Sequence, residues 1–289
     1  MSRTPQFSSV QEVRDRLSST GYLPDDATAT SVFLAGQLGK PLLVEGPAGV
    51  GKTELAKAVA AATGSQLVRL QCYEGIDEAR ALYEWNYRKQ LLRIQAAGDE
   101  RSWDSTHDEI FSAEFLLERP LLAAIRRTEP TVLLVDETDK ADVEVEALLL
   151  EVLSEFQVTV PELGTIAAST RPFVVLTSNA TRELSEALRR RCLYVHIGYP
   201  SAERELEIVL ARVPQAPADL AEQIVRTVHA LREMELKKSP SIAETLDWVH
   251  TLLALGLDTL DSATVRATLG TVTKHASDAE KAARMLKLG

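Results

Sequence analysis

Short apolar runs alternate with amphipathic stretches along the first two thirds of the chain. Polar or turn-forming residues bound each run, which is typical of strands that are buried on both faces of a sheet. Most of the stretches between the runs have the periodicity of helices, and such long crossovers connect parallel strands. We therefore predict an α/β fold with a five-stranded parallel sheet, whose strands lie at residues 41–45, 66–70, 131–135, 173–177 and 193–197.

One helix stands out because its apolar positions repeat at intervals of three and four residues, with glutamates on the opposite side. Its apolar positions are Val145, Leu148, Leu149, Val152, Leu153 and Phe156. We expect this helix to pack on the sheet. Residues 157–167 follow as two short extended pieces around a Pro-Glu-Leu-Gly turn, which predicts a β-hairpin.

The two ends of the chain have helical patterns only. Residues 10–17 and 25–38 form a helical preface within residues 1–40. From about residue 200 the strand signal disappears, and four further helices are expected at residues 202–212, 218–234, 242–255 and 262–276. We predict an αβα core domain over residues 1–200 and a small all-helical domain over residues 201–289, joined at Tyr199-Pro200.

Composition narrows the functional classes. The chain has 289 residues and a formal net charge of −10, which disfavours binding to nucleic acid. Its two cysteines, Cys72 and Cys192, and its scattered histidines fit neither a disulfide framework nor a familiar metal-ligand spacing. We see no signal peptide and no apolar run long enough for a transmembrane segment, so we expect a cytoplasmic protein.

A glycine-rich segment stands between the first predicted strand and a helix expected at residues 52–62. It matches the pattern G-x-x-x-x-G-K-[ST] and consists of Gly46, Pro47, Ala48, Gly49, Val50, Gly51, Lys52 and Thr53. Glycines let backbone N–H groups turn inward around a phosphate, and a helix N-terminus favours negative charge. In this pattern Lys52 reaches the β- and γ-phosphates of ATP and Thr53 ligates Mg²⁺. We predict that this segment and the next residue, Glu54, bind ATP.

An acidic pair follows the third predicted strand. Asp136 stands where a carboxylate holds Mg²⁺ against the phosphates, and Glu137 is placed to polarise an attacking water molecule. An acidic pair after a strand is usually an exposed turn. The glycine-rich segment upstream in the same sheet favours the catalytic interpretation, and a water-activating glutamate argues against a small-molecule kinase.

Two further groups of polar residues lie next to the fourth and fifth predicted strands. Asn179 comes after the fourth strand, where a short side chain can hold the attacking water or contact the γ-phosphate. Arg189, Arg190 and Arg191 precede the fifth strand, and one of them could reach the γ-phosphate of a neighbouring subunit. Taken alone, the asparagine would be a turn residue and the arginines a solvated basic patch.

In this order, the glycine-rich segment, the acidic pair, Asn179 and the arginines ending at Arg191 resemble an AAA+ ATPase. The Val-Thr-Val-Pro and Arg-Pro-Phe-Val segments, at residues 158–161 and 171–174, are similar to the MoxR group. Residues 71–77 and 83–87 resemble MoxR members encoded with carbon monoxide dehydrogenase and related molybdenum hydroxylases.

The resemblance implies a P-loop NTPase fold with a helical lid, assembled as a hexameric ring with ATP and Mg²⁺ at each subunit junction. It implies a chaperone or activase for a metalloenzyme client, with a von Willebrand factor A domain protein as partner and no nucleic acid. Arg191 best matches the finger supplied in trans, with Arg190 beside it. The hairpin around Pro161 and residues 99–111 would be insertions that couple nucleotide state to the client.

One departure from the family concerns the lid. Family members often carry an arginine in a Ser-Pro-Arg setting, whereas this chain has Ser239-Pro240-Ser241. Lys237 or Lys238 could replace that arginine, although a lysine pair at a helix end is more often surface charge.

Two other functions stay open beside the chaperone. One is an AAA+ motor or loader that acts on nucleic acid, and the other is an ATP-binding regulatory module with negligible turnover. Tyr73 and the aromatic residues around Trp85 could contact a partner or pack in the core.

Overall fold

The computed structural model describes residues 7–97 and 103–286, and the chain divides into two compact units. The first unit combines Met1–Thr20, Pro24–Glu45 and Thr53–His196. The second unit combines Gly21–Leu23 and Gly46–Lys52 with Ile197–Gly289. The glycine-rich segment therefore belongs, apart from Thr53, to the same unit as the C-terminal helices.

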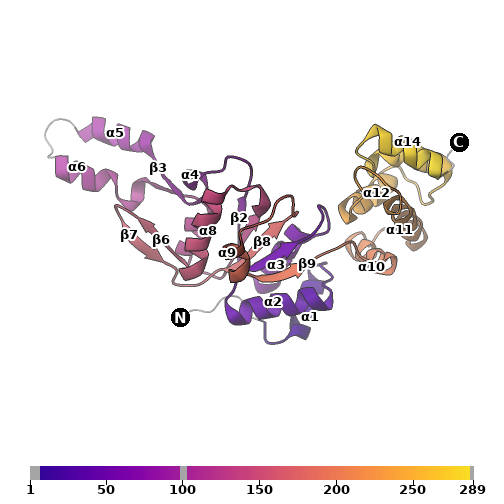
Figure 1. Ribbon diagram of the computed structural model, residues 1–289, viewed down its shortest axis with the longest axis horizontal. Coiled ribbons are helices and arrows are strands. Elements are labelled where there is room, and N and C mark those ends of the chain that lie inside the picture. Colours follow the sequence, from indigo (N-terminus) through magenta and orange to yellow (C-terminus); the bar gives the residue numbers. More distant parts are fainter. Residues whose placement is uncertain (1–6, 98–102, 287–289) are drawn as a thin grey trace. The chain divides into compact units, whose positions relative to one another are not determined.

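A parallel sheet forms the centre of the first unit (Figure 1), and within the described residues it has five strands in the order β2-β5-β8-β1-β9. The strands are β1 (Leu42–Glu45), β2 (Gln66–Gln71), β5 (Thr131–Asp136), β8 (Phe173–Ser178) and β9 (Leu193–His196). Every residue of β1, β5 and β8 is buried, which explains their continuous apolar runs. The predicted parallel sheet is confirmed, with strand ends displaced by about one residue.

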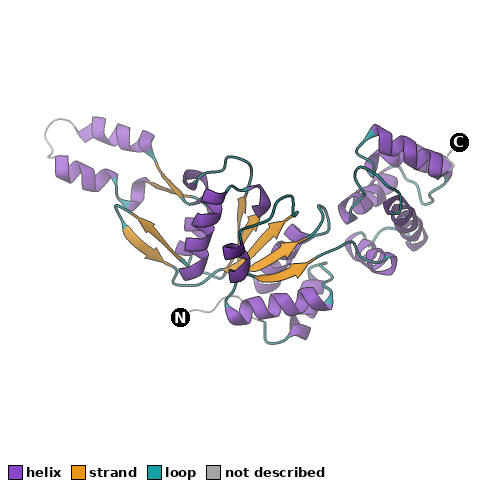
Figure 2. Ribbon diagram, viewed as in Figure 1, coloured by secondary structure: helices purple, strands orange, loops and turns teal. Residues whose placement is uncertain are grey.

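Helices flank this sheet (Figure 2). They are α1 (Val10–Ser19), α2 (Asp26–Leu38), α3 (Lys52–Thr63), α7 (Pro120–Arg126), α8 (Val143–Glu155) and α9 (Glu186–Arg191). Helix α2 packs against β1 and β9, and α7 packs against β2 and β5. Asp25 caps α2 by accepting a hydrogen bond from the Thr28 N–H, and Gly39 ends the helix in the left-handed conformation.

Helix α8 is the helix with the clearest periodicity. It buries Val145, Leu149, Val152 and Leu153, as predicted. Phe156, expected as its last apolar position, instead lies one residue beyond the helix in the left-handed conformation, and is still buried. This turn leads into an antiparallel hairpin of β6 (Gln157–Val160) and β7 (Gly164–Ala167), which the sequence predicted.

The segment between β2 and β5 contains elements that the sequence did not predict. They are α4 (Glu78–Ala81), β3 (Tyr83–Trp85), α5 (Tyr87–Ala97), α6 (Trp103–Ile110), a 3₁₀ turn η1 (Ala113–Phe115) and β4 (Leu116–Glu118). Strand β3 pairs antiparallel with β4, and α5 and α6 lie side by side (Figure 1). Trp85 is buried, with its ring edge-on to Phe111, so it packs in the core. Of the insertion expected at residues 99–111, residues 99–102 lie outside the described residues.

Helices make up the rest of the second unit: α10 (Ala202–Arg212), α11 (Ala218–Arg232), α12 (Ile242–Ala254), α13 (Ser262–Thr268) and α14 (Ala276–Met285), with a 3₁₀ turn η3 (Leu269–Thr271). Their core includes Leu220, Ile224, Trp248 and Leu252.

The prediction of a single helix at residues 262–276 is wrong. The α-helix ends at Thr268, and the 3₁₀ turn that follows contains Gly270, a weak helix former. The Thr268 hydroxyl also accepts a hydrogen bond from the buried Trp248 indole at 2.8 Å, which anchors this end of α13. Within the part of the chain that the structure describes, no helix combines the length and apolar character needed to cross a membrane.

Candidate functional site

The glycine-rich segment, which we call the phosphate loop (residues 46–53), needs glycine at two close approaches. Gly46 has φ of 154°, and a Cβ atom there would lie 1.9 Å from the Ile197 carbonyl oxygen. Gly49 has φ of 76°, and a Cβ atom there would lie 2.1 Å from the Ser241 hydroxyl oxygen. These contacts lie within the second unit. A side chain at either position would therefore displace the loop.

Lys52 begins α3 and points back into the phosphate loop. Its Nζ donates hydrogen bonds to the carbonyl oxygens of Gly46 and Pro47, each at 2.7 Å. The residue is only 6% exposed, so these acceptors compensate for burying the ammonium group. The loop thus holds a positive charge at its centre, as phosphate binding requires.

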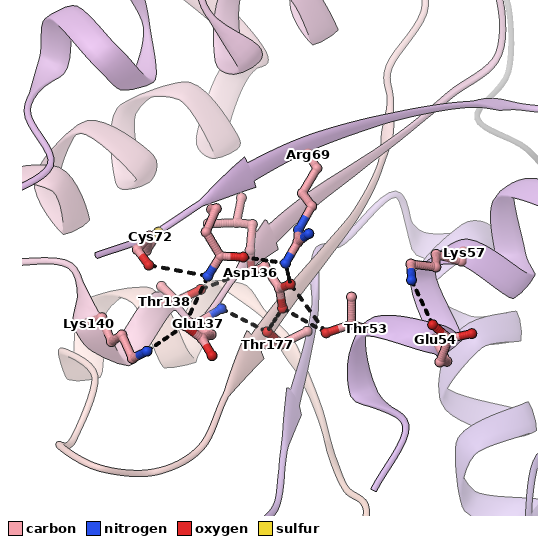
Figure 3. Close-up of polar contacts among 12 residues, drawn as sticks. Thr53, Glu54, Lys57, Arg69, Cys72, Asp136, Glu137, Thr138, Lys140 and Thr177 are labelled. Carbon is pink, nitrogen blue, oxygen red and sulfur yellow. Dashed lines mark hydrogen bonds and ion pairs between the residues drawn. The ribbon is translucent and has the colours of Figure 1, made fainter. Parts of the chain in front are cut away.

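Thr53, Asp136 and Thr177 meet where α3 begins and where β5 and β8 end (Figure 3). The Thr53 hydroxyl donates to the Asp136 carboxylate, 3.0 Å from Oδ1, and the Thr177 hydroxyl donates to the same oxygen at 2.5 Å. Asp136 is nearly completely buried. A hydroxyl and a carboxylate are hard oxygen ligands, so this pair fits Mg²⁺ held with the phosphates of a nucleotide. The described residues contain no cluster of three or more ligating side chains that could hold a metal ion by itself.

Glu137 has a strained backbone beside this pair. Its φ of 56° is in the left-handed region, which is uncommon outside glycine. The Thr177 hydroxyl stabilises this conformation by accepting a hydrogen bond from the Glu137 N–H at 2.9 Å. The side-chain oxygen Oε2 accepts from Gln71 Nε2 at 2.9 Å and from Lys140 Nζ at 2.6 Å. The hydrogen bond with Glu137 raises the pKa of Lys140.

Strand β2 contributes two residues that the sequence analysis did not single out for the site. Arg69 Nη2 donates to Asp136 Oδ2 at 2.6 Å, and it also donates to the side-chain oxygen of Gln71. In the β2–β5 register Gln71 lies opposite Asp136, and residues 69 and 71 share one face of the strand. The available signal was the pair of polar residues near the carboxyl end of a strand at the edge of the sheet.

Asn179 follows β8, as expected. Its backbone N–H donates to Asp139 Oδ1 at 3.2 Å, and the Thr181 hydroxyl donates to Asp139 Oδ2 at 2.6 Å. Burial raises the pKa of Asp139, but the hydrogen bonds from Thr181 and Asn179 outweigh burial and leave that pKa below its ordinary value. Asp139 therefore fixes the chain that carries Asn179. Thr177, two residues before Asn179, contacts both Asp136 and Glu137.

The three arginines have different surroundings. Arg189 donates to the Glu45 carboxylate at 2.8 Å, a hydrogen bond that raises the pKa of Arg189, and its guanidinium lies over the Tyr194 ring. Arg190 and Arg191 are exposed. Arg190 pairs with Glu186 at 2.5 Å, and Arg191 donates to the Ser154 hydroxyl at 2.7 Å. Among the described residues, neither exposed arginine contacts Asp136 or Glu137.

The Ser239-Pro240-Ser241 segment is held by an arginine from another helix. Arg232 in α11 donates from Nε to the Pro240 carbonyl at 2.7 Å and forms an ion pair with the buried Glu205. Ser241 caps α12 in a capping box with Glu244. The backbone N–H groups of Lys237 and Lys238 donate to the Asp278 carboxylate in α14, an element that the sequence analysis missed.

The cysteine beside the acidic pair is not a reactive thiol. Burial, followed by the nearby charges of Asp136, Asp139 and Glu137, raises the pKa of Cys72 to about 12. Burial also raises the pKa of Cys192 to about 12. Both thiols therefore stay protonated near neutral pH.

Comparison with known proteins shows the family of the chain. The family model described as the AAA domain (dynein-related subfamily) matches residues 41–192, more than half of the chain. The chain is 24% identical over 224 residues to uncharacterized protein SH1500 of Staphylococcus haemolyticus (strain JCSC1435), an alignment that covers 75% of this chain and 77% of the relative. The same figures hold for uncharacterized protein SAB1265c of Staphylococcus aureus (strain bovine RF122 / ET3-1).

Among solved structures, a RuvB variant of Thermotoga maritima is similar to the chain with a TM-score of 0.50 and 16% identity. That similarity covers 96% of this chain and 74% of the RuvB chain. At this identity it shows the fold alone, a P-loop core with a parallel sheet followed by a helical region.

Proposed function

The chain belongs to the AAA domain family, in its dynein-related subfamily, and from this membership we propose that it hydrolyses ATP in a hexameric ring to remodel a partner protein. The contact of Thr53 with Asp136, next to Glu137, carries this proposal. This contact supports the proposal because it joins the last residue of the phosphate loop to the acidic pair that we propose as magnesium ligand and general base. In this proposal residues 1–200 are the nucleotide-binding core and residues 201–289 are the lid.

Each residue of the site has a role in this proposal. Residues 46–54 bind ATP, and Lys52 exchanges its loop carbonyls for phosphate oxygens. Thr53 and Asp136 hold Mg²⁺, which supplies positive charge against the phosphates. Asn179 contacts the γ-phosphate.

Glu137 accepts the proton of the attacking water. In the structure its Oε2 already accepts two hydrogen bonds, from Gln71 and Lys140. If Oε2 is the oxygen that receives the proton, at least one of these donors must release it.

Arg191 is the arginine that we propose to complete the site of a neighbouring subunit, with Arg190 beside it. Its exposure and its hydrogen bond to a neutral serine leave its charge uncompensated by a carboxylate among the described residues. Arg189 is unsuited to that role because Glu45 holds it inside the first unit.

The partner is proposed from the sequence resemblance and from one surface. Tyr87, Leu91 and Leu92 on α5 are 61%, 60% and 67% exposed, which is unusual for large apolar side chains. Such a surface suits a protein rather than a polyanion, and the net charge of −10 also disfavours nucleic acid. We propose a MoxR-type chaperone of the cytoplasm that acts on a metalloenzyme client with a von Willebrand factor A domain partner.

A second candidate function is a nucleotide-binding switch with negligible turnover. The two donors that hold Glu137 Oε2 favour it, because a base kept in this state would bind nucleotide without hydrolysing it.

The first experiment measures ATP turnover against protein concentration, with mass photometry on the same samples, for wild type, Glu137→Gln and Arg191→Ala. Turnover per subunit should rise with a roughly sixfold assembly. It should fall about 10²- to 10⁴-fold in Glu137→Gln, which loses the general base, and about 10³-fold in Arg191→Ala, which still assembles. Glu151→Gln, an exposed glutamate on α8, is the matched control and should keep full turnover.

Two results would contradict this proposal. Activity that stays with the monomer would exclude the ring junction, and activity that survives Glu137→Gln would exclude this base. Nucleotide binding without turnover in wild type, at every concentration and with the partner present, would favour the switch. Salt-sensitive binding to DNA would favour a motor that acts on nucleic acid.

A further inference from the structure

Arg69 lies beside the proposed magnesium pair but has no role in the function proposed above. Its Nη2 is 2.6 Å from Asp136 Oδ2 (Figure 3). The Asp136 side chain is 3% exposed, whereas the Arg69 side chain is 48% exposed. A buried carboxylate without a compensating charge is costly. Arg69 supplies that charge from the solvent-facing side of the pair.

The other groups around Asp136 do not neutralise it. Thr53 and Thr177 donate from neutral hydroxyls. Lys140, the cation on the following turn, pairs with Glu137 instead. Among the described residues, Arg69 is therefore the partner that forms an ion pair with Asp136.

Arg69 also determines how Gln71 is oriented. It donates to the Gln71 side-chain oxygen, so the Gln71 amide nitrogen is directed to Glu137 Oε2, 2.9 Å away. One guanidinium on β2 thus touches the first carboxylate directly and orients the donor to the second. Being half exposed, it can also move toward water without unpacking the core.

We propose that Arg69 takes the place of the metal at Asp136, so that the site can hold a nucleotide when Mg²⁺ is absent. This inference rests on the proposed function and concerns the regulation of the same site. Without Arg69, the negative charge of Asp136 opposes the phosphates of a metal-free nucleotide. With Mg²⁺ present that charge is already compensated, and Arg69 is dispensable.

The test measures the dissociation constant of a fluorescent ADP analogue in Mg²⁺ and in EDTA. The quantity of interest is the ratio of the constant in EDTA to that in Mg²⁺. We expect Arg69→Gln to raise this ratio about fivefold or more, by weakening metal-free binding. Arg69→Lys should keep the ratio within about twofold of wild type, because it retains the charge.

Arg126→Gln is the matched control. The exposure of Arg126 is similar to that of Arg69, and Arg126 pairs with Glu118 at 2.7 Å. The variant therefore loses an arginine from an ion pair that does not involve Asp136. The ratio for this variant should equal that of wild type.

A second pair of variants guards against a folding defect in Arg69→Gln. In an Asp136→Asn background no buried charge remains to be compensated, so adding Arg69→Gln should leave the dissociation constant in EDTA unchanged. A further weakening in that background would overturn the inference, because Arg69 would then act on the nucleotide itself.

Other outcomes separate this inference from the proposed function. An unchanged ratio in Arg69→Gln, or equal weakening in both buffers, overturns the role of Arg69 while leaving the ATP site intact. Wild-type protein that binds no ADP in either buffer overturns the ATP site, and the Arg69 inference falls with it.

Discussion

The acidic end of β5 and the outer face of α5 differ in whether their side chains are engaged in contacts or exposed to solvent. Around Asp136 and Glu137, each carboxylate has at least two donors, from α3, β2, β8 or the following turn. On α5, by contrast, large apolar side chains such as Leu92 are exposed.

This difference indicates two kinds of ligand. At a site whose polar groups are already hydrogen-bonded, a ligand replaces each of those hydrogen bonds with one of its own, which suits a small charged molecule. An apolar face gains only when a second surface excludes water from it, which suits a macromolecule. The proposed function accordingly uses the first region for a nucleotide and the second for a protein.

The largest expected effect comes from disrupting the packing of the segment that carries α5. Trp85 lies between the insertion and the core, with its ring 5.2 Å from that of Phe111 and 6.4 Å from that of Tyr83. Trp85→Ala should lower the free energy of unfolding by about 3–5 kcal/mol, because it leaves a large cavity. Denaturant unfolding followed by circular dichroism measures this, and Trp85→Phe should recover part of the loss. A change below about 0.5 kcal/mol would show that the insertion is not packed on the core.

A medium effect is expected from one donor of the acidic site. Gln71→Ala removes the amide that holds Glu137 Oε2 and leaves Lys140 in place. Turnover should rise about threefold to tenfold, since the lost hydrogen bond frees Glu137 Oε2 to accept one from the attacking water. Steady-state hydrolysis and nucleotide binding, measured together, check this, and Gln157→Ala in the hairpin is a control that should have no effect. Slower turnover with unchanged binding would mean that Gln71 orients Glu137 rather than restrains it.

The smallest effect on the isolated protein is expected on α5. Replacing Leu91 and Leu92 by serine should leave basal turnover within about twofold and unfolding within about 0.5 kcal/mol, because both side chains are exposed. Stimulation by a protein partner should be lost in the same variant. Leu38→Ser, an exposed leucine on α2, is the control that keeps stimulation. A drop in basal turnover would show that the α5 face contributes to assembly of the enzyme itself.

The parts of the fold that followed from the sequence are those with a long or repeated pattern. Strands β5 and β8 are continuously apolar, and α8 repeats its apolar positions over three turns, so burial determines both. Within the segment from α4 to β4, the strands β3 and β4 escaped prediction because each has only three residues, which is shorter than any reliable period. Its strands are specified by their pairing with each other, which a linear pattern does not contain.

The candidate site likewise contains residues that the sequence predicted and residues that it did not. Lys52, Thr53 and Asp136 belong to contiguous motifs whose chemistry is apparent from their order. Arg69 and Gln71 could not be assigned, because their relation to Asp136 depends on the register between β2 and β5. The role of Thr177 likewise depends on where β8 ends relative to β5.

The position of β1 in the sheet has a consequence for biosynthesis. β1 is the first strand to be made, yet Leu42 pairs with Val175 of β8 on one side and with Leu193 of β9 on the other. The edge of β1 that pairs with β8 stays open until Ser178 has been made, and the edge that pairs with β9 stays open until His196 has been made. A nascent chain therefore carries an apolar strand with both edges open while residues 46–178 are being made, and such strands invite mispairing. The phosphate loop, which continues directly from β1, is accordingly attached to an unpaired strand until that point.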